Sequence, residues 1–259
     1  MANIKGAKNE ARLMRRDLVR CYKKEKSDLK RRYFSELYSF YDKIGVARPI
    51  DPPRRTTLEE IGNAVSHGLG AFLSVFALVV MLLRSHDGVS RLGATVYFFG
   101  LFSMFLSSCL YHALGHGTRA KRVFRRFDYA SVYLLIGASF FPLILNFVGA
   151  RAGVVMIACQ WAIIFTAIVL VAVFGPERFY MLHIAFYLVL GWSGLLLLPR
   201  LIGGSGSFAR YIFGGGIIYT LGVIPCAMKG RGAHFVWHIF VLLGAAVQWG
   251  GMLTFLYPK

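Results

Sequence analysis

The sequence predicts an all-α integral membrane protein, a bundle of seven transmembrane helices. Of its 259 residues, 56% are hydrophobic and only 16% are charged, and the mean hydropathy is +0.56. Soluble domains usually carry about 25% charged residues. The apolar residues gather in seven runs of about 18–23 residues, which is close to the length that crosses a bilayer core. The connections are short, so we expect consecutive helices to be antiparallel neighbours.

The membrane domain is expected to span residues 58–259, after a polar and basic segment at residues 1–57. The seven crossings are predicted at residues 61–83, 92–114, 128–148, 154–174, 180–198, 211–228 and 233–256. The protein is therefore expected to be a multi-pass membrane protein, and the sequence does not specify which cellular membrane holds it.

The basic N-terminal segment contains apolar side chains at helical spacing. They are Tyr33, Leu37, Phe40, Tyr41 and Ile44. One interpretation is a partly amphipathic helix that rests on the anionic cytoplasmic leaflet. The alternative is a solvated helix that packs against loops of the bundle.

The distribution of Lys and Arg predicts the orientation of the bundle. The side that holds the N-terminus collects 24 of these residues, and the opposite side collects six. Cytoplasmic segments carry the excess of basic residues, so the N-terminus is expected in the cytoplasm and the C-terminus outside. Much of this excess lies in the N-terminal segment. Because the other basic residues flank hydrophobic runs, we expect no nucleic-acid partner.

Five polar residues are predicted to meet in one layer near the inner surface of the membrane. His234 and His238 lie four residues apart, so they share one face of the seventh helix. The second helix ends in this layer with Ser108 and His112, and the third helix begins there with Asp128. Ionisable side chains at this depth are costly and commonly mark functional sites.

The first helix contributes further polar residues to this layer. Glu60, Asn63 and His67 fall on one of its faces and form a possible accessory set. For His67 we favour a polar contact within the bundle over a role as a metal ligand. His183 is expected at the interface near the inner end of the fifth helix.

Three imidazoles with an open fourth position form the ligand arrangement of catalytic zinc. His112, His234 and His238 are the candidate ligands; neutral imidazole also binds copper, iron or nickel, so zinc is favoured but not required. Asp128 is placed to orient or deprotonate a water molecule. Ser108 is placed to hydrogen-bond that water, to steady Asp128 or to stabilise a developing oxyanion.

Each of these residues also has a purely structural interpretation. A histidine pair one turn apart can be a hydrogen-bonded packing feature of a membrane helix. Asp128 can be a carboxylate favoured at a helix start by the helix dipole. Ser108 can bond the backbone carbonyl one turn earlier.

With these residues in view, the chain resembles the hemolysin III family. That family belongs to the progestin and adipoQ receptors, in a superfamily shared with adiponectin receptors and alkaline ceramidases. The matching segments span the membrane domain and are Glu60-Ile-Gly-Asn63-Ala-Val-Ser-His67, Ser107-Ser108-Cys-Leu-Tyr111-His112, Phe127-Asp128-Tyr129 with Phe141-Pro142, and His234-Phe-Val-Trp237-His238. The resemblance implies a zinc ion near the inner leaflet, held by the three histidines, with Ser108 and Asp128 beside it.

Three functions are consistent with this pattern. The first is a zinc-dependent hydrolase of a ceramide-like lipid amide, which would reach the site laterally from the membrane lipids. The second is a receptor or sensor of the progestin and adipoQ receptor type in which the zinc is structural. The third is a cytolytic or pore-forming protein, for which the sequence offers little because no polar stripe lines the crossings.

Overall fold

The computed structural model describes residues 2–43, 52–228 and 230–258. Internal contacts divide the chain into two compact units, residues 1–51 and residues 52–259. Helices form all of the regular structure in the described part of the chain, which contains no strand. The all-helical prediction is confirmed.

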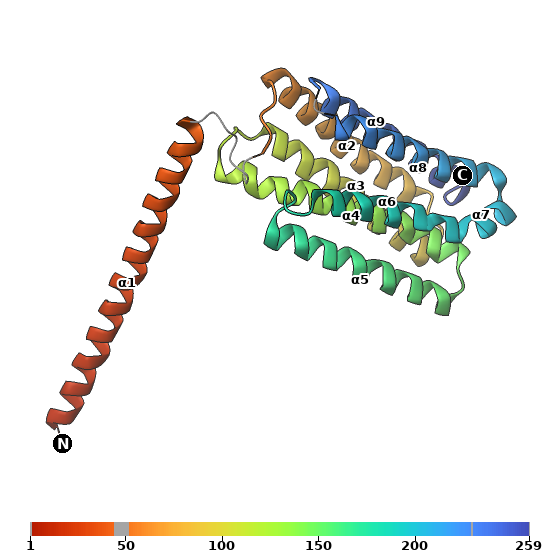
Figure 1. Cartoon of the computed structure of the whole chain (residues 1–259). Coiled ribbons are helices and arrows are strands. Elements are labelled where there is room, and N and C mark those ends of the chain that lie inside the picture. The colour runs from red at the N-terminus through yellow and green to blue at the C-terminus, as the bar shows by residue number, and fades with distance from the viewer. Residues whose placement is uncertain (1, 44–51, 229, 259) are drawn as a thin grey trace. The chain divides into compact units, whose positions relative to one another are not determined.

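The N-terminal unit contains one continuous helix, α1 (Ala2–Lys43), of 42 residues (Figure 1). Its sequence is rich in Lys and Arg and has no proline, and both features favour a long helix. Tyr33 and Phe40 of the predicted apolar stripe are 61% and 57% exposed. The side chain of Tyr41 and all of Ile44 lie outside the described residues.

The second unit contains seven segments long and apolar enough to cross a membrane. The helices are α2 (Thr57–Leu83), α3 (Gly88–Ala113), α4 (Arg119–Phe147), α5 (Ala150–Phe174), α6 (Tyr180–Trp192), α7 (Leu198–Gly204), α8 (Gly206–Ala227) and α9 (Ala233–Phe255). The fifth crossing is composite, because the 3-10 turn η1 (Ser193–Leu197) joins α6 to α7. The protein is an integral, multi-pass membrane protein with the predicted number of crossings.

Several helices begin earlier than the hydropathy pattern predicts. Helix α4 begins at Arg119 instead of Asp128, because Thr118 caps its first turn by accepting a hydrogen bond from the Lys121 amide at 3.1 Å. The basic residues assigned to a loop therefore lie on the first turns of α4. Asp128 lies in about the third turn rather than at the helix start.

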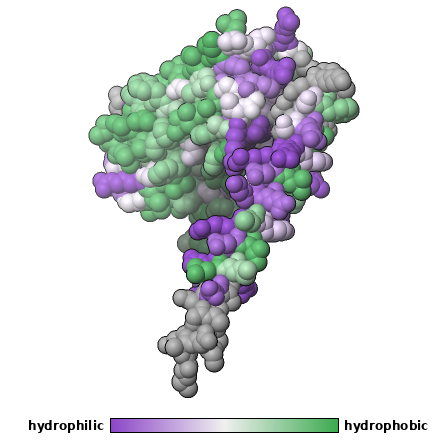
Figure 2. All heavy atoms as spheres, turned by 90° about the vertical axis from the view of Figure 1, so that its left-hand side faces the viewer, coloured by the Kyte–Doolittle hydropathy of each residue, from purple (hydrophilic) through white to green (hydrophobic). Residues whose placement is uncertain are grey.

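The helices pack in a bundle in which α3 lies between α2 and α4, and α9 lies between α2 and α8 (Figure 1). Helix α5 lies outside α4 at the edge of the bundle. Hydrophobic residues cover the left-hand part of the surface that Figure 2 shows. Large side chains such as Phe72 and Leu83 are 72% and 82% exposed, as expected for helix faces in contact with lipid.

The orientation of the helices defines two ends of the bundle. Helices α2, α4, α6 and α9 begin at one end, where α3, α5 and α8 finish. We call this the inner end, since the distribution of Lys and Arg predicts that it faces the cytoplasm.

Small residues allow α3 and α4 to approach each other closely. A Cβ atom added at Gly100 would overlap the Cβ of Ala138 and would lie 3.1 Å from the Leu134 carbonyl oxygen. Close packing across small residues is a main source of helix association in membranes.

We therefore expect Gly100→Ala to lower the free energy of unfolding by about 1–3 kcal/mol, because the added methyl overpacks this contact. The measurement is thermal or denaturant unfolding in detergent. Gly250→Ala is the matched control, since a Cβ at Gly250 meets nothing within 4 Å. It should leave stability unchanged or raise it slightly. Equal stability of both variants would contradict the packing assignment.

Candidate metal centre

Three histidines from two helices come together at the inner end of the bundle. His112 lies in the last turn of α3, and His234 and His238 lie in the first turns of α9. One nitrogen atom from each ring lies within 4.8 Å of the others. The ring centroids are 4.8–5.3 Å apart. The topology thus brings the three predicted ligands into one cluster.

Each of these rings has a buried nitrogen that is unpaired among the described residues. These atoms are His112 Nε2, His234 Nε2 and His238 Nδ1. Burying a ring nitrogen without a hydrogen-bond partner costs free energy, so three such nitrogens in one cluster require an explanation. Three neutral imidazole nitrogens form a donor set that suits zinc, copper, iron or nickel. The residues present can therefore hold a metal ion.

A carboxylate fixes the orientation of the His112 ring. His112 Nδ1 lies 2.6 Å from Glu60 Oε2 and 3.4 Å from Asn63 Nδ2. When Nδ1 donates its proton to the carboxylate, Nε2 is left with a free lone pair, which is the atom that faces no partner. Metal-binding histidines commonly make such a bond with their second nitrogen. Glu60 and Asn63 thus contact a candidate ligand directly.

A buried lysine completes this network. Lys121 Nζ lies 3.0 Å from Glu60 Oε1 and donates to the Leu114 carbonyl oxygen at 2.9 Å. Its side chain is only 1% exposed, and a lysine this buried requires such partners. Lys121 is not among the site residues predicted from the sequence, because hydropathy places it in a loop between two crossings. Glu60 was the sequence signal that could have pointed to Lys121, because a carboxylate at membrane depth needs a cation beside it.

The start of α9 is tied to the start of α2. The Gly232 amide donates to a Glu59 carboxylate oxygen, and Gly232 has φ +77°, which favours glycine. Glu59 also closes a capping box with Thr56 at the start of α2. These bonds hold the helix that carries His234 and His238 in register with α2.

His67 packs against the cluster without joining it. Its ring stacks on His238 with centroids 3.8 Å apart and meets Phe105 edge-on at 5.2 Å. It is not part of the group whose nitrogen atoms converge. Its position is that of a packing contact which supports the His238 ring.

His183 lies deeper than the sequence predicts. The residue was expected at the interface, but it is completely buried, and its Nδ1 lies 2.8 Å from the Tyr133 hydroxyl. Tyr133 comes from α4, so His183 Nδ1 has its hydrogen-bond partner inside the bundle, whereas Nε2 has none among the described residues. The position of His183 near a helix end does not by itself show that a neighbouring helix covers the side chain.

The histidine cluster opens onto an apolar cavity of about 170 Å³. Ser108, Asp128, His234 and His238 all line it, and the Ser108 hydroxyl interacts with the Asp128 carboxyl. Most of the other lining residues are apolar or aromatic side chains of α3, α4, α6, α8 and α9. Four of the five residues predicted for the inner layer therefore line this cavity, and the fifth, His112, contacts the rings of His234 and His238.

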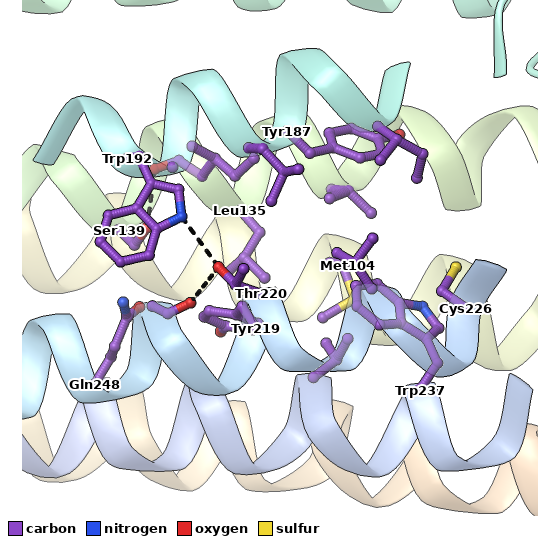
Figure 3. A pocket seen from close by; sticks show the side chains of 18 of the residues that line it. Met104, Leu135, Ser139, Tyr187, Trp192, Tyr219, Thr220, Cys226, Trp237 and Gln248 are labelled. Atoms are coloured by element: carbon purple, nitrogen blue, oxygen red, sulfur yellow. Dashed lines mark hydrogen bonds between the residues drawn. The ribbon is translucent and has the colours of Figure 1, made fainter. Parts of the chain in front are cut away.

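Figure 3 shows the cavity between α6 and α8, with Met104, Trp237 and Cys226 toward one end. At the other end, Trp192 Nε1 donates to Thr220 Oγ1 at 3.1 Å. Thr220 in turn donates to the Gly216 carbonyl oxygen at 2.8 Å. The cavity is thus lined mainly by apolar side chains, and the hydrogen-bonded pair of Trp192 and Thr220 lies at the end away from the histidines.

Comparison with known proteins gives consistent matches over the membrane unit. The family model described as "Haemolysin-III related" matches residues 55–249. The chain is 30% identical over 205 residues to Hemolysin-3 of Bacillus cereus, covering 77% of this chain and 93% of that protein. It is 31% identical over 198 residues to a Hemolysin-3 homolog of Bacillus subtilis (strain 168), covering 74% and 92%. It is 29% identical over 214 residues to the human Monocyte to macrophage differentiation factor, covering 78% and 86%.

If Glu60 orients His112, Glu60→Gln should weaken metal binding by about 10- to 100-fold, because the ring loses its charged acceptor. The measurement is competition with a chelator of known affinity, with thermal unfolding recorded in parallel. Glu177→Gln is the matched control, since Glu177 pairs with Arg125 at 3.3 Å and contacts no candidate ligand. Equal metal affinity of the wild-type protein and Glu60→Gln would rule out the orienting role.

Proposed function

Because this chain belongs to the haemolysin-III related family, we propose that it is a zinc-dependent hydrolase of a ceramide-like lipid amide. One observation carries the proposal: three imidazoles with unpaired nitrogens lie beside Asp128 and Ser108 at the end of an apolar cavity. A metal cluster alone would serve a structural role equally well. A carboxylate and a hydroxyl that line the same cavity add the groups that hydrolysis requires.

The protein's own residues would prepare the site for this reaction. A bound zinc ion would supply a Lewis acid and would make water acidic enough to ionise near neutral pH. Glu60 holds His112 in the orientation that presents Nε2 to the cluster. Asp128 would position water and accept its proton, and Ser108 would donate a hydrogen bond to charge that develops on the amide oxygen.

The shape of the cavity supports a lipid substrate. Its apolar lining between α6 and α8 suits a hydrocarbon chain, because apolar contacts in the cavity can replace the chain's contacts with water or with lipid. Both helices belong to membrane-crossing segments, so the substrate would enter from the bilayer. The reactive amide would then lie at the histidine end and the chain along the cavity.

Two rival functions remain to be separated by experiment. A receptor or sensor with a structural metal would use the same histidines but would not need Asp128. The names of the Bacillus relatives point to cytolytic activity. Leakage from liposomes that carry the protein, persisting in His238→Ala, would favour the cytolytic function over hydrolysis.

We expect about one zinc ion per chain in protein purified without chelators. His234→Ala/His238→Ala should lose the metal and remain folded, because two of three ligands are gone. Elemental analysis and thermal unfolding in detergent make the comparison. Chelation should lower the midpoint temperature of the wild-type protein and added zinc should restore it. If the wild-type protein contains no metal, the three histidines have a packing role instead of a metal-binding role.

Asp128→Asn should retain zinc but hydrolyse lipid amides at least about 100-fold more slowly, since general-base assistance is worth about 10²–10⁴-fold. The assay is release of fatty acid from N-acyl amides by the purified, zinc-loaded protein. Asn is nearly isosteric with Asp, so metal content and thermal unfolding serve as controls for the fold. A protein that hydrolyses no lipid amide while it is folded and zinc-loaded would refute the proposal.

A further inference from the structure

Helix α1 carries a narrow apolar face that runs along most of its length. With a rotation of about 100° per residue, six apolar side chains of the helix fall within an arc of about 100°. We call them the α1 stripe; they are Met14, Leu18, Tyr22, Leu29, Tyr33 and Phe40. All six side chains are exposed. The stripe contains Tyr33 and Phe40 of the set predicted from the sequence and continues from there toward the N-terminus.

The stripe repeats every eleven residues, from Leu18 to Leu29 and from Leu29 to Phe40. Tyr22 and Tyr33 are separated by the same interval. An eleven-residue repeat corresponds to about 3.67 residues per turn, close to the about 3.6 of a straight helix, so the stripe stays on one face. Helices gain most of their stability from packing such a face. In the described part of the first unit, residues 2–43, no second element covers it.

The two flanks of the stripe carry opposite charges. Arg12, Arg15 and Lys26 lie on one side of it. Glu10, Asp17 and Asp28 lie on the other side. Each acidic residue is thus level with a basic residue of the opposite flank, two positions away in the sequence.

Side-chain contacts place these flanks beside the stripe. On the basic flank, Lys26 Nζ lies 5.9 Å from the centre of the Tyr22 ring. On the acidic flank, Asp28 and Leu29 line one shallow hollow of the helix surface together with Arg32. Arg32 is the exception to the charge division on this flank. Charges that border an apolar stripe in this way decide which partner the stripe accepts.

A second copy of α1 in parallel orientation fits this pattern. In a parallel, in-register pair the basic flank of one helix lies opposite the acidic flank of the other, so Arg15 of one copy lies near Asp17 of the second. An antiparallel pair would set basic flank against basic flank and acidic against acidic. An anionic lipid surface would attract one flank and repel the other, whereas helices that rest on such a surface carry Lys and Arg on their polar face.

We propose that the α1 stripe is the seam of a parallel, two-stranded coiled coil between two copies of this chain. The eleven-residue repeat gives the coil a right-handed twist. Glu25 and Glu36 interrupt the stripe, and polar residues on a coiled-coil seam lower its stability. The inference is independent of the proposed function, because α1 precedes residues 55–249, which the family model matches.

The test is disulfide trapping of the full-length protein in phosphatidylcholine vesicles. The starting variant has serine in place of all four cysteines, which are Cys21, Cys109, Cys159 and Cys226. Single cysteines are then introduced as Leu18→Cys and Phe40→Cys, on the stripe, and as Leu13→Cys, an exposed position on the far side of the helix. Mild oxidation with copper phenanthroline and a non-reducing gel report the dimers.

We expect Leu18→Cys and Phe40→Cys each to form a disulfide-linked dimer, because a parallel pair sets every stripe residue beside its own counterpart. Leu13→Cys should give only background, since a disulfide requires Cα atoms within about 7 Å. Positions 18 and 40 lie about 33 Å apart along the helix, so an antiparallel pair can link at most one of them. Thermal unfolding shows whether each variant is folded.

Substitutions on the stripe should change dimer formation in both directions. In the Leu18→Cys background, Leu29→Glu should weaken dimerisation by about 10- to 100-fold, the effect of losing a buried leucine side chain. Leu13→Glu is the matched control and should dimerise as its parent does. Glu36→Leu should strengthen dimerisation, because it removes an interruption of the seam.

Two patterns of cross-links would overturn the proposal. Linkage at only one of positions 18 and 40 identifies an antiparallel pair. No linkage at either position, or equal linkage at position 13, shows that the stripe is not a seam between copies. If the stripe cysteines instead become protected from a water-soluble thiol reagent when phosphatidylserine is added to the vesicles, the partner is the anionic lipid surface.

Discussion

The hydrogen bond between Glu60 and His112 is the interaction on which the inner end of the bundle depends. A carboxylate at this depth is costly unless its charge is matched, and Lys121 matches it from α4. The same carboxylate orients an imidazole of α3. One acidic side chain of α2 therefore links three helices. The neighbouring Glu59 adds the fourth, α9, through the Gly232 amide.

The histidine cluster follows from these links. Three rings with unpaired nitrogens would not be stable as a set of isolated polar groups in an apolar bundle. Glu60 orients the His112 ring, His67 stacks on the His238 ring, and the Gly232 amide at the start of α9 is bound by Glu59. One nitrogen atom of each ring in the cluster lies within 4.8 Å of the others. Such an arrangement is expected where a ligand completes the network.

The cavity joins two environments that a lipid-processing site needs. Along α6 and α8 its lining is apolar, and at the inner end it carries Asp128, Ser108, His234 and His238. Low dielectric around these polar groups strengthens their interaction with charge that develops in a reaction.

The sequence by itself determined the seven crossings, because hydrophobic length is a local property. It also brought Ser108, His112, Asp128 and the α9 histidines to one layer, since helix direction alternates with each crossing. Tertiary structure alone decided which polar groups are partners. Lys121 lies in a stretch that hydropathy assigns to a loop, and His183 Nδ1 has a hydrogen-bond partner only because α4 supplies Tyr133. Long-range pairing depends on how helices rotate and pack against one another, and no short stretch of sequence contains that information.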